Sequence, residues 1–164
     1  MKTCALDANC LIDAARTESP LHGMMQRLLA AAKEGIVCFK VSLHTLHELE
    51  GKKDEAWDLA KNLDELPYWP IGSWDEQVGS WKQQTGSTND AKRNNEIQMH
   101  LKRLAKSGTD IRDRGAYIDA LRAGLTGFLT SDKQLVGSGP QVRINEAFPT
   151  RVLTPQQLAD ELGV

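Results

Sequence analysis

The chain has 164 residues, of which 26% are charged, and a net charge of −2 at neutral pH. This length suits one ordinary domain, or one domain with an insertion, that buries its own core. The near-neutral charge disfavours a protein that holds nucleic acid by bulk electrostatics alone. The chain also lacks the apolar segment of a signal peptide or of a membrane span, which needs roughly 18 apolar residues.

Three cysteines, Cys4, Cys10 and Cys38, are odd in number and form no C-x-x-C pair. This pattern supports neither a disulfide framework nor a zinc site. Each cysteine lies in or beside an apolar stretch. We therefore expect them to be small buried hydrophobic residues in a protein of the reducing cytoplasm.

The first fifty residues predict alternating strands and helices. The apolar run at 3–6 is typical of a strand, and apolar residues at helical spacing predict a short helix over 9–15. A stronger helical pattern runs over 20–35 and stops at a glycine. A second strand is expected at 36–41, where β-branched and aromatic residues gather, and a helix over 43–50.

The middle of the chain predicts helices separated by loops. Residues 54–66 indicate a charged, exposed helix, 75–84 another helix, and 94–106 a polar helix with one apolar face. Turn residues surround aromatic ones at 67–74, which suits a short strand or a loop, and 85–90 is a polar loop.

The last third predicts a helix over 110–123, strands at 127–130 and 141–144, and a final helix over 155–162 that Thr154 caps. Strands separated by helices favour an α/β fold with a parallel sheet. In such sheets the functional crevice lies outside the carboxyl ends of the strands. Polar residues at strand ends are therefore the first candidates for a functional site.

Two carboxylates follow predicted strands. Asp7 comes directly after the first strand, and Asp132 follows the strand at 127–130. Taken singly, each has an ordinary structural explanation, because acids commonly cap helices and begin turns. If both strands are central and parallel, however, both carboxylates emerge at the same edge of the sheet.

Two further acids lie on helices that flank these strands. Asp113 is near the start of the helix at 110–123, and Glu48 is on the helix that follows the second strand. An acid in a first helical turn is stabilised by the helix dipole, so a structural role remains open. Their neighbours Asp110, Asp119 and Glu50 are competitors for the same roles.

Three or four carboxylates at one place would repel one another unless a cation joined them. Mg²⁺ and Mn²⁺ prefer carboxylate and water oxygens, and they activate water for attack on phosphate. Because the sequence offers no obvious serine or cysteine nucleophile, this pattern predicts metal-assisted hydrolysis of phosphodiesters.

The ordered set of these residues resembles the PIN-domain nuclease family over nearly the whole chain. The set comprises L-D-A-N at 6–9, Glu48, Asp113, T-S-D at 130–132 and V-L-T-P-Q-Q-L at 152–158. The nearest subgroup is the VapC-like toxins of bacterial toxin–antitoxin pairs. The resemblance implies a single domain, 1–164, with a three-layer α/β/α fold around a central parallel sheet. It also implies Mg²⁺- or Mn²⁺-dependent cleavage of RNA, and it leaves open an antitoxin partner and a homodimer.

The resemblance also assigns roles to residues. Asp7, Asp113 and Asp132 would hold the metal directly or through waters, and Glu48 would complete the site and orient the attacking water. Supporting roles fall to Asn9 and Thr130.

The chain departs from the family in two places. It is longer than a typical toxin of this group, with a helical elaboration expected within 51–106. The helix after Asp113 carries Asp119 and Arg122 where many relatives are rich in alanine.

The stretch before and around Asp113 is locally basic, which suits contacts with RNA phosphates beside an acidic site. A solvated helix face is an equally good explanation. The candidate RNA-binding residues are Lys102, Arg103, Arg112 and Arg114.

Two other classes of protein remain open. One is a non-catalytic PIN-like module that binds RNA or a protein partner, although a full acid set argues against it. The other is a phosphatase with Asp7 as its nucleophile, although such enzymes commonly carry D-x-D, and here Asn9 takes the second position.

Overall fold

The structure is a computed structural model of the whole chain. It describes residues 1–67, 73–75, 80–82, 93, 96, 97, 99, 100, 115–137 and 139–164.

Five parallel strands form the central sheet, in the order β3-β2-β1-β6-β7. β1 (Lys2–Leu6) lies in the middle, between β2 (Val37–Val41) and β6 (Gly127–Leu129). β3 (Asp64–Glu65) pairs with β2 at one edge, and β7 (Arg151–Leu153) pairs with β6 at the other. The chain adds strands outward from β1 on one side and from β6 on the other. The order therefore changes direction between β1 and β6.

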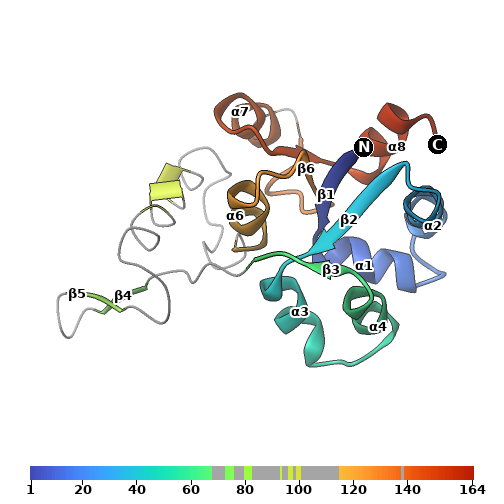
Figure 1. Cartoon of the computed structure of the whole chain (residues 1–164), viewed down its shortest axis with the longest axis horizontal. Helices are drawn as coiled ribbons and strands as arrows, with labels where there is room; N and C mark the ends of the chain where they lie inside the picture. The colour runs from blue at the N-terminus through green and yellow to red at the C-terminus, as the bar shows by residue number, and fades with distance from the viewer. Residues whose placement is uncertain are drawn as a thin grey trace.

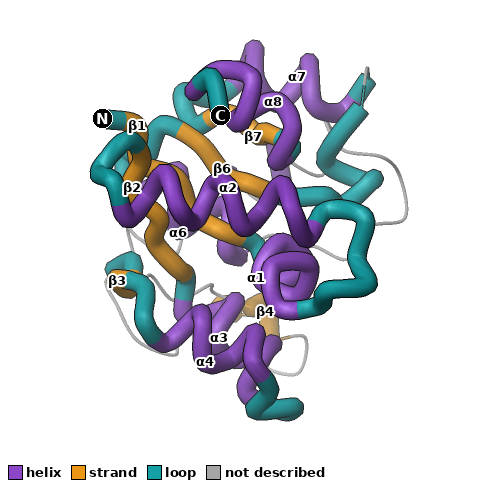
Figure 2. The backbone as a smooth tube through the Cα atoms, turned by 90° about the vertical axis from the view of Figure 1, so that its right-hand side faces the viewer, coloured by secondary structure: helices purple, strands orange, loops and turns teal. Residues whose placement is uncertain are grey.

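Helices cover both faces of this sheet, so the predicted three-layer α/β/α fold is confirmed. Figure 1 shows α6 and α7 on one side of the strands and α1, α2 and α8 on the other, and Figure 2 looks onto the face that α1 and α2 cover. None of the helices in the described part of the chain is long and apolar enough to cross a membrane. The seven described helices are α1 (Ala8–Ala15), α2 (His22–Lys33), α3 (Leu43–Glu50), α4 (Glu55–Lys61), α6 (Gly115–Arg122), α7 (Pro140–Ala147) and α8 (Pro155–Leu162).

The core has two halves, one on each face of the sheet. Leu6 and Leu129 belong to the cluster formed with α1, α2 and α8, whereas Ala5 and Phe128 belong to the cluster formed with α6 and α7. Successive residues of a strand point to opposite faces, so a strand covered on both faces must be apolar throughout. This explains the uninterrupted apolar runs that the sequence shows at these strands.

The cysteines form no disulfide. Cys4 and Cys10 are fully buried in the core, and Cys38 is partly buried. Burial raises the pKa of the Cys4 thiol to about 11, so this side chain stays neutral and packs as a hydrophobic residue, as expected.

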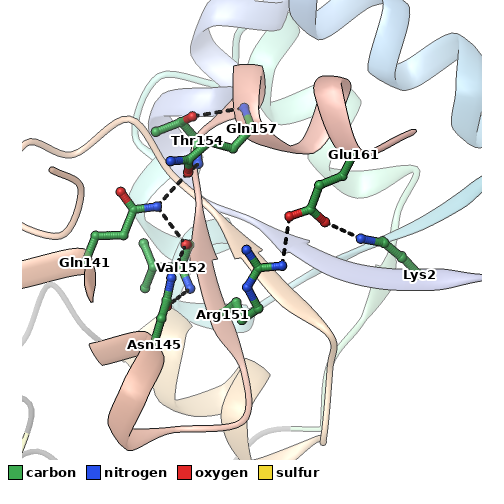
Figure 3. Close-up of polar contacts among 8 residues, drawn as sticks. All are labelled: Lys2, Gln141, Asn145, Arg151, Val152, Thr154, Gln157 and Glu161. Carbon is green, nitrogen blue, oxygen red and sulfur yellow. Dashed lines mark hydrogen bonds and ion pairs between the residues drawn. The ribbon is translucent and has the colours of Figure 1, made fainter. Parts of the chain in front are cut away.

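One predicted strand is wrong. Residues 141–144 lie within the helix α7, which has Pro140 in its first turn. The Gln141 side chain donates from Nε2 to the Val152 carbonyl at 2.9 Å and to Gln157 Oε1 at 2.6 Å (Figure 3). These contacts tie α7 to β7 and α8, and a local pattern of apolar residues cannot foresee them.

Two predicted helices in the middle of the chain are also wrong in part. The helix expected over 54–66 ends at Lys61, and Asp64 and Glu65 instead pair with β2. Within the helix expected over 75–84, β5 (Ser80–Lys82) pairs in antiparallel fashion with β4 (Ser73–Asp75). Most of the helix expected over 94–106 lies outside the described residues.

The predicted cap of the last helix is confirmed. The Thr154 hydroxyl accepts a hydrogen bond from the Gln157 N–H, and the Gln157 side chain accepts one from the Thr154 N–H (Figure 3). Further along α8, Glu161 accepts hydrogen bonds from Lys2 and from Arg151. The last helix is thus fixed to the first and last strands of the chain.

We expect the Glu161 contacts to stabilise the protein at neutral pH and to lose their effect in acid. The hydrogen bond from Lys2 lowers the pKa of the Glu161 carboxyl. A carboxyl whose pKa is lower in the folded state contributes stability above its usual pKa, and that contribution disappears as the pH falls through the folded-state value. The difference in urea midpoint between wild type and Glu161→Gln should therefore shrink between neutral pH and about pH 3. A difference that is constant with pH would contradict this.

We expect Thr45→Val to stabilise the protein by about 1 kcal/mol, because it removes a polar group that is buried at a cost. Thr45 is 1% exposed, and its hydroxyl has no hydrogen-bond partner within the described part of the chain. The matched control is Thr150→Val. Thr150 is equally buried, but its hydroxyl donates to the Leu125 carbonyl at 2.8 Å. This control should destabilise by about 1–3 kcal/mol. Urea denaturation of both variants tests the opposite signs.

Candidate functional site

Asp7 links the central strand to the first helix. Its N–H donates to the Leu129 carbonyl at 2.9 Å, which continues the pairing of β1 with β6. Its backbone is extended, and its Oδ1 accepts a hydrogen bond from the Ala8 N–H at 2.8 Å, so it also caps α1. The sequence places an acid here because the residue must end a buried strand and begin a helix.

The Thr130 hydroxyl joins the groups at the ends of β1 and β6. It donates to Asp7 Oδ2 at 2.7 Å and accepts from Asn9 Nδ2 at 3.3 Å and from the Asp132 N–H at 3.0 Å. Thr130 is fully buried, and its own N–H donates to the Leu153 carbonyl. A single hydroxyl therefore fixes the orientation of the Asp7 carboxylate and the path of the chain after β6.

Asn9 holds this arrangement from α1. Its side chain donates to Thr130, and its Oδ1 accepts from the Ser131 N–H at 3.3 Å. Because a backbone N–H only donates, the amide oxygen must face Ser131 and the amide nitrogen must face Thr130. Asn9 thus reaches Asp7 through Thr130.

Asp132 begins a turn. Its Oδ1 accepts from the Gln134 N–H at 2.9 Å, and its carbonyl accepts from the N–H groups of Leu135 and Val136. The other carboxylate oxygen accepts no hydrogen bond from any described residue. Asp132 therefore has a structural role and also presents an oxygen near the carboxyl edge of the sheet.

Glu48 is exposed on α3, the helix that follows β2. α3 begins just after the carboxyl end of β2, and β2 is the strand that pairs with β1. Glu48 is therefore related to Asp7 through neighbouring strands of the sheet.

The remaining predicted site residues lie outside the described residues. They are Asp113, Lys102, Arg103, Arg112 and Arg114. Among the residues that are described, no three histidine, cysteine, aspartate or glutamate side chains gather as a metal site. Because Asp113 is one of its four members, the predicted carboxylate cluster stays a prediction.

A second polar cluster, of Ser42, His44 and Asp119, lies close to this edge. The sequence does not show that these three residues meet. Asp119 is 1% exposed on α6 and accepts a hydrogen bond from the Ser42 hydroxyl. His44 Nε2 lies 3.7 Å from the same carboxylate oxygen. Burial, followed by the charge of His47, lowers the pKa of His44, so its imidazole is neutral at neutral pH. The one feature of the sequence that points to a buried Asp119 is its position between Ile118 and Ala120 in a short apolar helix.

Comparison with known proteins adds no family to this description. No family model matches the chain, and no curated protein matches it either.

We expect Thr130→Val to destabilise the protein by about 1–3 kcal/mol, because it leaves the Asn9 amide nitrogen and the Asp132 N–H without this acceptor and removes the hydroxyl that donates to Asp7 Oδ2. Thr130→Ser keeps the hydroxyl and should be the milder change, since it removes only a methyl group from a fully buried side chain. Guanidinium denaturation of both variants measures the difference. Equal stability of the two would show that the hydroxyl does not support this region.

Proposed function

We propose that this chain is a divalent-metal-dependent endoribonuclease of the PIN-domain kind, nearest to the VapC-like toxins. The observation that carries the proposal is the network in which Thr130 holds the Asp7 carboxylate, with Asp132 two residues further along. These are the T-x-D and strand-end D-x-N residues on which the sequence resemblance rests.

The position of this network in the sheet supports the proposal. The strand order changes direction between β1 and β6, and Asp7 and Thr130 directly follow these two strands. Open parallel sheets bind their ligands in the crevice outside the carboxyl ends of strands at such a point. The hydrogen bonds at this edge thus support a functional role in addition to a structural one.

The chemistry of the donors fits a hard cation. The hydrogen bonds from the Ala8 N–H and the Thr130 hydroxyl fix the orientation of the Asp7 carboxylate, and carboxylate oxygens are the ligands that a hard cation prefers. Asp132 offers its second oxygen. When bound, Mg²⁺ or Mn²⁺ would polarise the scissile phosphate and lower the pKa of an attacking water. Asp7, Asp132 and, from the resemblance, Asp113 would hold the ion, while Glu48 would orient the water.

One observation favours the alternative of a non-catalytic module that binds RNA or a protein. Asp7 caps α1 and Asp132 caps a turn, so both acids already have structural roles without a metal. As a toxin, in contrast, the protein would also need an antitoxin that covers the carboxyl edge of the sheet. Metal dependence separates the two functions.

We expect the protein to cleave single-stranded RNA oligonucleotides in the presence of Mn²⁺ and to stop when EDTA is added. Asp7→Asn should lower the cleavage rate at least about 100-fold, because it removes the charge of a metal ligand and keeps an oxygen for the helix cap. The control is Asp58→Asn, which changes an exposed acid on α4. It should cleave like wild type.

Activity that survives both EDTA and Asp7→Asn would exclude the proposed mechanism. Wild-type protein that neither cleaves RNA nor gains melting temperature with Mn²⁺ would support the non-catalytic module, since an ion that binds only the folded state must stabilise it.

A further inference from the structure

Asp119 is a buried acid on α6, a helix that packs on the sheet near the proposed site. It is 1% exposed, and all residues of α6 from Gly115 to Ala120 are buried. A carboxylate in such surroundings destabilises the fold unless polar groups compensate for the lost water. The groups that face it therefore identify what it holds in place.

Ser42 is one group that faces Asp119. It is fully buried and directly follows β2, and its hydroxyl donates to Asp119 Oδ2 at 2.5 Å. The same hydroxyl accepts from the His44 N–H at 3.1 Å and so caps α3. One hydroxyl thus anchors the first turn of α3 to the middle of α6.

His44 and Gly115 bring the two helices together at a second point. A Cβ atom on Gly115 would lie 2.8 Å from three atoms of the His44 ring, a distance that side chains do not tolerate. Only glycine lets α6 approach the imidazole this closely. The ring is also held next to Asp119, with 3.7 Å between His44 Nε2 and the carboxylate.

Glu48 stands on the helix that this contact holds against α6. Glu48 lies four residues after His44 on α3, so the two side chains share one face of the helix. Asp113 precedes Gly115, the first residue of α6, by two residues in the sequence. The hydrogen bond between Ser42 and Asp119 therefore joins two helices. α3 carries Glu48, and α6 follows Asp113 in the sequence.

We propose that Asp119 is a positioning residue for the carboxylate site: through Ser42 it holds α3 against α6, so that Glu48 faces the edge of the sheet beside Asp7. This inference rests on the proposed function, because it assumes that the acids share a cation. Asp119 itself is 1% exposed and accepts a hydrogen bond from Ser42, so we assign it to the packing of the two helices. It acts by fixing the helix on which Glu48 stands.

The test compares Asp119→Leu with Asp119→Asn by Mn²⁺ titration, following the melting temperature and the electron paramagnetic resonance signal of free Mn²⁺. Leucine fills the space without accepting a hydrogen bond and should weaken Mn²⁺ binding about 10–100-fold, as loss of an outer partner of a metal ligand commonly does. Asparagine keeps an oxygen for Ser42 and should bind within about threefold of wild type.

A control variant separates positioning from general loss of stability. Tyr117→Phe removes a buried hydroxyl from the same helix, where it donates to the Thr150 carbonyl at 2.7 Å on the side away from Ser42. It should lower the melting temperature and leave the Mn²⁺ affinity unchanged. A positioning role requires that Asp119→Leu weaken Mn²⁺ binding where Tyr117→Phe does not.

If Asp119→Leu does not fold, the pair Ser42→Ala and Ser42→Thr replaces it, because alanine removes the donor and threonine keeps both donor and cap. Ser42→Ala should then weaken binding and Ser42→Thr should not. Wild-type affinity in the variants without the hydrogen bond would overturn the positioning role and leave the proposed function standing. Wild-type protein that binds no Mn²⁺ would overturn both.

Discussion

The hydrogen bond from the Thr130 hydroxyl to the Asp7 carboxylate is the contact on which the candidate site depends. It crosses between β1 and β6, the two strands at which the order of the sheet changes direction. Leu6 pairs with Leu129, so Asp7 and Thr130, the residues that follow them, lie side by side. Each of them also completes the structure around it, Asp7 as the cap of α1 and Thr130 as the acceptor for the chain after β6. Loss of this bond would therefore disturb the sheet edge, the first helix and the following turn together.

A structural role for Asp7 does not exclude a functional one. A helix cap needs one acceptor oxygen, and a carboxylate has two oxygens, each with more than one lone pair. The sequence alone presents these roles as alternatives, because a lone acid after a strand fits either. In the structure they are compatible: Oδ1 caps the helix, and Oδ2 receives the Thr130 hydroxyl. The cap keeps the carboxylate in one orientation at the sheet edge.

The sequence predicts well what depends on local pattern. The strands at 3–6, 36–41 and 127–130 are apolar because they are covered on both faces, and this shows in a short window. Prediction from the sequence fails where contacts between residues far apart in the chain determine the structure. The segment at 141–144 is a helix that Gln141 fixes through Val152 and Gln157. Ser42 caps α3 through a contact two residues along the chain, but its bond to Asp119 joins residues 77 apart in the sequence, and no local pattern contains it.

At the ends of two strands, a hydroxyl side chain orients a carboxylate. Thr130 directly follows β6 and donates to Asp7, and Ser42 directly follows β2 and donates to Asp119. In these two bonds a neutral hydroxyl, rather than lysine or arginine, orients the carboxylate. A hydroxyl fixes the direction of a carboxylate without cancelling its charge, whereas a cationic side chain would do both. Asp7 lies at the carboxyl edge of the sheet, after its central strand, whereas Asp119 is enclosed between α6 and the first turn of α3. The same kind of contact therefore orients one acid at the edge of the sheet and joins two helices through the other.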